Sequence, residues 1–267
     1  MKSVKQSLLF AAFLLLFAGC GGIDPDPDPG GGSGGGTTPP AVVKDVTVGI
    51  VQSGMGSTTK GYFIKCLTDA GAYCTVFPEY ATTDALAENF VKSVDAVIIP
   101  GKFTDDISGR KAHDERVVKA AIAAGKPILG ICLGHQHINS ALGGTSPKIS
   151  DNYPNSTVLH KNSVNGTNVG LTTEAHSITI AQDSRLAEIL KSTQAMVNTS
   201  HDYSVKNLGT GLKATAWADD GVVEALEGTR IMGVQFHPEY LYGMMEIKKF
   251  LAIFQNLTDE ARAAKAN

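Results

Sequence analysis

Short apolar runs alternate with stretches of helical spacing from about residue 45 onward, and this alternation constrains the fold more than any other feature. The helical stretches lie at 84–92 and 111–124. The apolar runs are rich in β-branched residues and occupy 46–51, 72–77, 94–100 and 126–131. Runs that are apolar on both faces are typical of buried parallel strands, which have helices on either side. The pattern therefore predicts an α/β fold with a doubly wound sheet.

A different pattern follows in the C-terminal half of the chain. Its three apolar runs, joined by short turns such as DDG, are 212–218, 221–228 and 229–236. They predict an antiparallel meander. A closing helix is expected at about 244–255. The folded domain should accordingly span 45–258, and residues 259–267 should form a C-terminal tail.

A cysteine stands where one apolar run ends and a helix is expected to begin. In KPILGICLGHQHINSALGG (126–144), Cys132 follows the strand directly, and Gly130 and Gly134 leave room for a sharp turn. Such a turn exposes its side chain at the carboxyl edge of the sheet, where open α/β folds bind ligands. A helix N-terminus also favours a thiolate. The segment fits a nucleophile and, equally, a buried structural cysteine.

A histidine and a glutamate near the C-terminus supply the partners that a nucleophilic cysteine needs. In GVQFHPEY, His237 and Glu239 are two positions apart, so both side chains project to the same side of an extended segment. The imidazole can take the thiol proton, and the carboxylate can fix its tautomer. A surface turn is the alternative interpretation of His-Pro-Glu. The combination with Cys132 indicates catalysis better than either part alone.

Four segments resemble those of class I glutamine amidotransferase-like proteins, and most closely the γ-glutamyl hydrolase branch. GKPILGICLGHQHINSALGG resembles the nucleophile segment, and VVEALEGTRIMGVQFHPE resembles the segment that carries the base. AHSITIAQDSRLAEIL and VNTSHDYSV resemble the region between them. The resemblance covers about residues 45–255. It implies a flavodoxin-like, doubly wound, mostly parallel sheet with a C-terminal antiparallel extension.

The resemblance also implies the catalytic roles. Cys132 would be the nucleophile, His237 the general base and acid, and Glu239 the residue that orients the histidine. A γ-glutamyl amide or peptide bond would be cleaved through a γ-glutamyl thioester that water hydrolyses. This chemistry needs no metal and no other cofactor. His135 and His137, on the helix after the cysteine, are expected to be structural.

The resemblance assigns further residues to the oxyanion hole and to substrate binding. The backbone N–H groups of Leu133 and of Gly101 or Lys102 would hold the oxyanion. Lys102 departs from the Pro-Gly-Gly or Pro-Gly-Ser of relatives. Leu133 stands where hydrolases often carry Arg, and Gln136 is then expected to contact the glutamyl group. His201 is also expected at the substrate, although relatives often show His-His-Gln there.

The N-terminus is expected to direct export. Lys2 and Lys5 precede the apolar run LLFAAFLLLFAG, which has the length of a signal-peptide core. The following FAGC resembles a bacterial lipobox, so residues 1–19 would be a signal peptide and Cys20 would be lipidated. Phe17 departs from the usual Leu of that motif. The alternative is an ordinary secretory signal with an incidental cysteine.

A spacer follows the expected lipidation site. Residues 20–44 are rich in Gly, Pro and Asp and have almost no apolar side chains, so they should form a flexible tether. The expected location is the bacterial cell envelope, with the domain anchored to a membrane by lipid. Gly21 stands where an Asp would retain the protein at the inner membrane. The outer membrane, facing the periplasm or the surface, is therefore expected.

Two cysteines are left once Cys20 and Cys132 have roles. Cys66 lies near the end of an expected helix and Cys74 in the strand after the next turn. An exported protein meets oxidising conditions, so a disulfide between them is one hypothesis. Two reduced core cysteines are the other.

Charge narrows the classes of partner. The formal net charge is −3, and no long Lys/Arg run occurs, so nucleic acid is not expected and small γ-glutamyl substrates are. Three functions stay open: a membrane-tethered γ-glutamyl hydrolase, a glutaminase subunit that supplies ammonia to a partner synthase, and a non-catalytic binding lipoprotein. The sequence does not indicate an oligomeric state.

Overall fold

The structure is a computed structural model that describes residues 44–266, except 52–53, 78–79, 103–108, 162, 165–166 and 169. The predicted signal peptide, the lipidation site Cys20 and all but the last residue of the predicted tether lie outside the described residues. Within the described part, no helix is both long and apolar enough to cross a bilayer.

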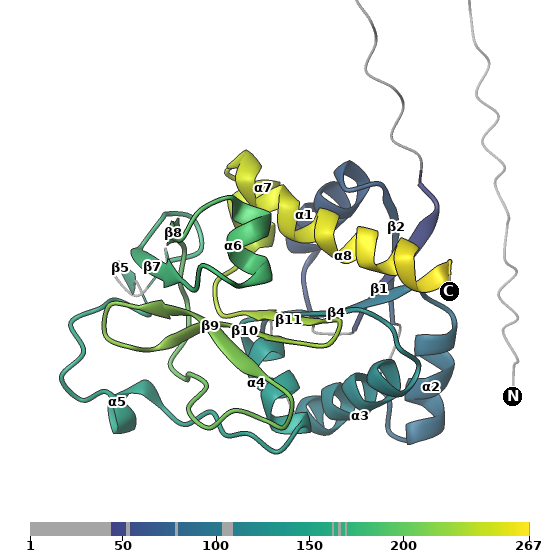
Figure 1. The fold of residues 1–267 in the computed structure, drawn as a ribbon, viewed down its shortest axis with the longest axis horizontal. Coiled ribbons are helices and arrows are strands. Elements are labelled where there is room, and N and C mark those ends of the chain that lie inside the picture. The colour runs from purple at the N-terminus through teal and green to yellow at the C-terminus, as the bar shows by residue number, and fades with distance from the viewer. Residues whose placement is uncertain are drawn as a thin grey trace, which may run out of the picture. The chain divides into compact units, whose positions relative to one another are not determined.

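A mixed sheet organises the described part of the chain (Figure 1), with nine strands in the order β2-β1-β3-β4-β11-β10-β9-β7-β8. The parallel strands are β1 (Val46–Ile50), β2 (Ala72–Val76), β3 (Ala96–Ile99), β4 (Ile128–Ile131) and β11 (Ile231–Val234). The antiparallel extension consists of β10 (Val223–Gly228), β9 (Lys213–Ala218), β7 (His176–Ile180) and β8 (Gln194–Val197). This topology confirms the predicted fold class, including the antiparallel extension.

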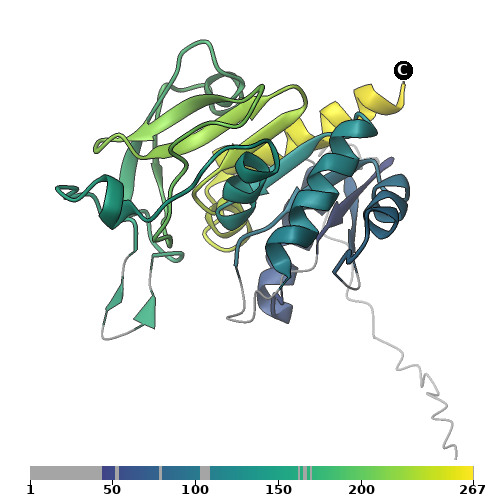
Figure 2. The same cartoon turned by 90° about the horizontal axis from the view of Figure 1, so that it is seen from below.

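Helices cover both faces of the parallel strands. On one face lie α1 (Ser57–Asp69) and α8 (Leu251–Lys265). On the other face, α2 (Asp84–Lys92), α3 (Arg110–Ala123) and α4 (Leu133–Ala141) lie side by side, as Figure 2 shows. The shorter elements are α5 (Ile149–Asn152), β5 (Ser163–Val164), β6 (Thr167–Asn168), α6 (Arg185–Leu190), α7 (Pro238–Gly243) and the 3-10 helix η1 (Lys248–Phe250).

Strand β3 shows why the parallel strands are apolar at every position. Ala96 and Ile98 belong to the hydrophobic cluster under α1 and α8, whereas Val97 and Ile99 belong to the cluster under α2 and α3. All four side chains are fully buried. Because successive residues of a strand point to opposite faces, a strand between two helical layers needs apolar residues at both.

The C-terminal boundary differs from the prediction. A closing helix was expected at 244–255 and a tail at 259–267, but α8 begins at Leu251 and continues through Lys265. Ala261 is buried on its inner face, and the Thr258 hydroxyl donates to the Ala70 carbonyl at 3.0 Å. The expected tail is therefore the end of a packed helix, because its small apolar residues continue the helical period.

The predicted disulfide is not formed, and the structure corrects it. Cys66 and Cys74 are both free thiols. Helix α1 packs against α7, so the Cys66 sulfur faces the Glu239 carbonyl oxygen at 4.0 Å instead of turning toward strand β2. Burial raises the pKa of Cys74 to about 11, and it also raises the pKa of Cys66. Both thiols are thus the reduced core cysteines of the second hypothesis.

Candidate active site

Cys132 occupies a strained turn between β4 and α4, as the sequence predicts. Its backbone has φ 52° and ψ −105°, and it is the residue that precedes the first turn of α4. A positive φ is uncommon for a residue with a side chain, and it recurs at functional sites. The Cys132 N–H donates to the Val234 carbonyl at 2.8 Å, which ties the turn to β11. The turn holds the sulfur at the carboxyl edge of the sheet.

The two glycines beside Cys132 are required by close packing. A Cβ atom added at Gly134 would lie 1.9 Å from the backbone oxygen of Ile99. One added at Gly130 would lie 2.4 Å from Ile138 Cδ1 and 2.9 Å from the carbonyl carbon of Gly134. Real Cβ contacts are not this short, so α4 can approach the sheet this closely only because both positions are glycine.

His237 and Glu239 form a buried pair. The Nδ1 atom of His237 lies 2.7 Å from Oε1 of Glu239, and both residues are buried. The local backbone differs from the extended segment on which the prediction rested. His237 is instead the residue before α7, with Pro238 in the first turn of that helix, where proline is favoured. The predicted pairing is present, and the turn of a helix produces it.

Asn198 holds the histidine backbone from both sides. The His237 N–H donates to Asn198 Oδ1 at 2.9 Å, and Asn198 Nδ2 donates to the His237 carbonyl at 3.1 Å. The sequence reasoning did not single out this asparagine. Its only signal was its place in VNTSHDYSV, one of the segments that carry the family resemblance.

The electrostatics of the pair favour a charged histidine. Burial disfavours the imidazolium, but the carboxylate of Glu239 and the hydrogen bond with Cys132 outweigh it and raise the pKa of His237 to about 10. The imidazolium is thus the favoured form near neutral pH. Such a ring can stabilise a thiolate at Cys132 and can donate a proton to a leaving group.

Two of the backbones expected to hold the oxyanion, those of Gly101 and Leu133, lie next to Cys132. A Cβ added at Gly101 would lie 2.7 Å from His237 Cε1 and 3.5 Å from Cys132 Cβ, so Gly101 lies against both residues. Leu133 opens helix α4, where the backbone N–H groups of the first turn have no partner within the helix. Lys102 is exposed. The oxyanion role of these three backbones stays a prediction.

A buried ion pair behind the Gly101 loop was missed at the sequence level. The Arg110 guanidinium donates to the Pro100 carbonyl at 2.9 Å and to Asp114 at 2.7 Å. Asp114 also lies 2.7 Å from Nδ1 of His137, which is therefore structural, as expected. The four-residue spacing of Arg110 and Asp114 was the available signal, but an exposed helix pair has the same spacing.

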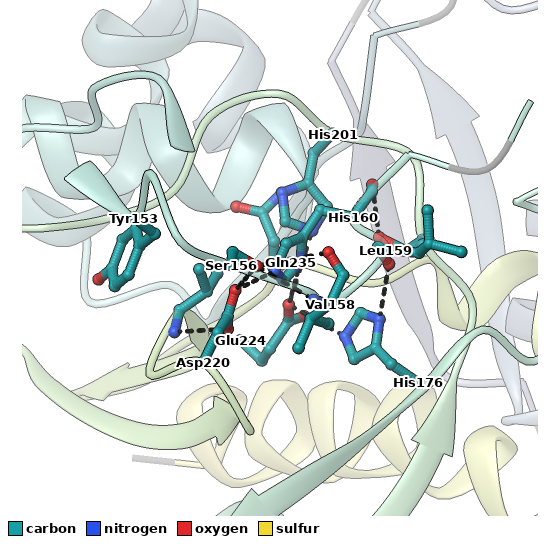
Figure 3. Close-up of polar contacts among 12 residues, drawn as sticks. Tyr153, Ser156, Val158, Leu159, His160, His176, His201, Asp220, Glu224 and Gln235 are labelled. Carbon is teal, nitrogen blue, oxygen red and sulfur yellow. Dashed lines mark hydrogen bonds and ion pairs between the residues drawn. The ribbon is translucent and has the colours of Figure 1, made fainter. Parts of the chain in front are cut away.

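The two residues expected to contact the substrate also make contacts within the protein. Gln136 donates both amide hydrogens within the protein, to the Tyr203 carbonyl at 3.0 Å and to Gln235 Oε1 at 3.1 Å. The rings of His201 and two further histidines surround Glu224 (Figure 3). Gln136 thus links helix α4 to the loop 198–205 by a hydrogen bond. Its contact with the glutamyl group stays a prediction, as does that of His201.

A family profile and several known proteins resemble this chain. The profile of the Peptidase C26 family matches residues 102–239, which end at Glu239. YvdE of Lactococcus lactis, named as a glutamine amidotransferase-like protein, is 30% identical over 222 residues, or 76% of this chain and 89% of YvdE. Anthranilate synthase component 2 of Mycobacterium tuberculosis is 33% identical over 159 residues, or 54% of this chain and 55% of that protein.

A solved structure shares the fold. A Thermoplasma acidophilum protein described as a GMP synthase subunit aligns with a TM-score of 0.62 and 17% identity, covering 83% of this chain and 96% of that chain. At this identity the likeness concerns the fold alone. The profile match and the extent of the similarity to YvdE show that this chain belongs to the Peptidase C26 family of class I glutamine amidotransferase-like proteins.

Proposed function

We propose that this protein is a cysteine hydrolase of γ-glutamyl amide or peptide bonds. One observation carries the proposal: a cysteine on a strained turn lies beside a buried histidine that is hydrogen-bonded to a buried carboxylate. Cysteine, histidine and an orienting carboxylate form the nucleophile, base and orienter of acyl-transfer enzymes. The assembled set also argues against a purely non-catalytic binding protein.

The chemistry proceeds in two steps. The Cys132 thiolate attacks the γ-carbonyl carbon, and the C–N bond breaks as His237 gives its proton to the leaving nitrogen. The γ-glutamyl thioester that remains is attacked by water, which gives a proton to His237. The C–S bond then breaks, and glutamate and the thiolate are released. Glu239 orients the imidazole in both steps, and backbone N–H groups at Leu133 and Gly101 stabilise the oxyanion.

Steady-state kinetics on the protein alone test this function. We expect the purified chain to release glutamate from at least one γ-glutamyl peptide or amide, with water as the acceptor. The panel should include glutamine, γ-glutamyl peptides and the matching α-glutamyl peptides, and the Cys132→Ala chain serves as the blank. Hydrolysis should not rise sharply when cell extract is added.

The opposite kinetic result would favour the second candidate, a glutaminase that delivers ammonia to a partner synthase. The similarity to anthranilate synthase component 2 keeps this candidate open. Glutamine hydrolysis that appears only with an added partner would replace the hydrolase proposal by this one. Absence of hydrolysis under both conditions would reject both enzymes.

We also propose that lipid at Cys20 anchors the enzyme in the cell envelope, with 20–44 as a tether, at the outer membrane. FAGC and the composition of the spacer support this. Intact-mass measurement of membrane-extracted protein should show loss of residues 1–19 and an added diacylglycerol at Cys20. A Cys20→Ala chain should lack that mass and leave the membrane fraction. An uncleaved or unmodified Cys20 in the natural chain would contradict the proposal.

A further inference from the structure

Three histidine rings surround one buried carboxylate in the antiparallel part of the fold (Figure 3). Glu224 lies on β10 and His176 on β7, while His160 and His201 come from neighbouring segments that are joined by a backbone hydrogen bond of 2.8 Å. Each of the four side chains is at least nine-tenths buried. We refer to these four residues as the Glu224 cluster. The catalytic steps use none of them.

The ring nitrogens that face inward converge on one oxygen. The Oε1 atom of Glu224 lies 3.2 Å from His176 Nε2, 3.5 Å from His160 Nδ1 and 3.6 Å from His201 Nε2. The ligand atoms of Glu224, His160 and His176 all lie within 4.8 Å of one another. Three nitrogen and oxygen atoms that metals bind thus lie close together, and the His201 nitrogen lies 3.6 Å from one of them.

The opposite nitrogen of each ring is held by the protein. His160 Nε2 lies 2.8 Å from the Asp220 carboxylate. His176 Nδ1 donates to the Leu159 carbonyl at 3.1 Å, and His201 Nδ1 donates to the Tyr203 carbonyl at 3.0 Å. Carbonyl and carboxylate oxygens only accept, so these outer nitrogens carry the hydrogens.

A neutral ring with its outer nitrogen protonated presents a lone pair on the inner one. In neutral rings the inner nitrogens turn acceptors toward the Glu224 carboxylate, which is also an acceptor. The 3.2 Å contact between His176 Nε2 and Glu224 Oε1 is a hydrogen bond only when a second proton is on that ring. Among the described residues, His160 Nδ1, His201 Nε2 and Glu224 Oε2 have no hydrogen-bond partner. Buried polar atoms without partners cost free energy, so a positive group at the centre of the cluster would stabilise it.

Protons would stabilise these inner atoms poorly. One proton on one ring satisfies one nitrogen and leaves the others facing acceptors. Protonating all three rings would crowd three cations, with the His160 ring only 5.1 Å from that of His176 and 4.9 Å from that of His201 between centroids. A single divalent cation interacts favourably with every inner atom at once.

We propose that His160, His176 and Glu224 bind a divalent transition-metal ion, zinc by their ligand chemistry, with His201 placed to complete the site. Imidazole nitrogen and carboxylate oxygen are zinc ligands, and about 2.0–2.1 Å from a tetrahedral zinc they lie about 3.3 Å apart. The separations of 3.2 Å and 3.5 Å from Glu224 Oε1 to His176 and His160 match this spacing. Metal-bound histidines also direct their second nitrogen to a carboxylate or carbonyl oxygen, as all three rings do here.

The metal has a structural role. It joins β7, β10 and the segments that carry His160 and His201, and Ser200 beside them faces the catalytic sulfur. Hydrolysis needs no metal in its chemical steps, so the expectation of a metal-free reaction is unchanged. The ion thereby fixes the position of the segment whose Ser200 carbonyl lies 3.9 Å from the Cys132 sulfur.

Zinc binding by the full-length chain tests the site without reference to activity. The Cys132→Ala background prevents zinc from binding at the catalytic thiol. After chelator treatment, calorimetric titration with Zn²⁺ and metal counting after gel filtration should give one ion per chain. Zinc-edge X-ray absorption should show nitrogen and oxygen ligands, with imidazole among them.

Variants locate the ion. His176→Gln and Glu224→Gln should each weaken zinc binding by more than about 100-fold, because each removes a ligand directly, whereas loss of an outer partner already costs about 10- to 100-fold. His137→Gln is the matched control, since His137 is another buried histidine paired with a carboxylate, Asp114, outside the cluster. In the Cys132→Ala background, the His137→Gln chain should bind zinc as tightly as the Cys132→Ala parent chain does. Circular dichroism verifies that each variant is folded.

Two results would overturn the proposal. One is a parent chain that takes up no zinc or shows sulfur ligands in the absorption spectrum. The other is folded His176→Gln and Glu224→Gln chains that bind zinc as tightly as the parent. If either variant fails to fold, the titration and the spectrum of the parent chain decide the question without it.

Discussion

Replacing Cys132 with alanine should lower γ-glutamyl hydrolysis by about 10⁴-fold or more, because the covalent thioester can no longer form. The fold should persist, since alanine has one heavy atom fewer and the backbone contacts of the turn remain. Labelling by an electrophilic glutamine analogue should disappear with the activity. Thermal melting of both proteins should show a nearly unchanged transition.

The histidine provides the matched comparison. His237→Ala should lose nearly as much activity as Cys132→Ala, and the double variant should fall little further, because a nucleophile and its base act as a unit. Glu239→Gln should cost less, since it keeps the shape and only weakens the orientation. Labelling that persists in Cys132→Ala would show that another residue is the nucleophile.

Replacing Gly134 with alanine should destabilise the protein by about 3 kcal/mol, although alanine is the better helix former. The new Cβ would lie 1.9 Å from the Ile99 backbone oxygen, so helix α4 must move away from β3. Movement of α4 displaces Cys132 and the Leu133 N–H. A misplacement of about 1 Å can lower activity by about 100-fold. Urea unfolding and kinetics on the folded variant measure the two effects.

Gly61 offers the control for this substitution. It lies in helix α1, is exposed, and has no atom within 4 Å of an added Cβ. Gly61→Ala should therefore stabilise the protein by about 0.5–1 kcal/mol and leave activity unchanged. If Gly134→Ala behaved in the same way, the tight contact between α4 and β3 would not be what holds the nucleophile turn.

The turn that carries Cys132 was predictable because its causes are local. An apolar run, a cysteine and two nearby glycines define a strand, a sharp turn and a helix within a few residues. The pairing of His237 with Glu239 was also predicted, although for the wrong backbone. Pro238 favours the first turn of a helix, and that signal in the sequence indicates α7 rather than an extended segment.

Side-chain direction was not predictable from spacing. Cys66 and Cys74 are close in sequence, yet the packing of α1 on α7 turns Cys66 toward the Glu239 carbonyl. Arg110 and Asp114 have the spacing of an ordinary surface pair. Only the tertiary structure buries both of them and brings the guanidinium to the Pro100 carbonyl, directly before Gly101.

The sequence by itself determined the layered α/β fold and the position of Cys132 at a strand-to-helix turn, because hydrophobic period and turn residues act over short stretches of chain. The tertiary structure alone decided the Glu224 cluster. His160, His176, His201 and Glu224 are separated by 16 to 25 residues from one to the next, and no spacing in the sequence indicates that they meet. They meet because β7 and β10 both pair with β9 in the antiparallel extension, and the segments carrying His160 and His201 pack beside them.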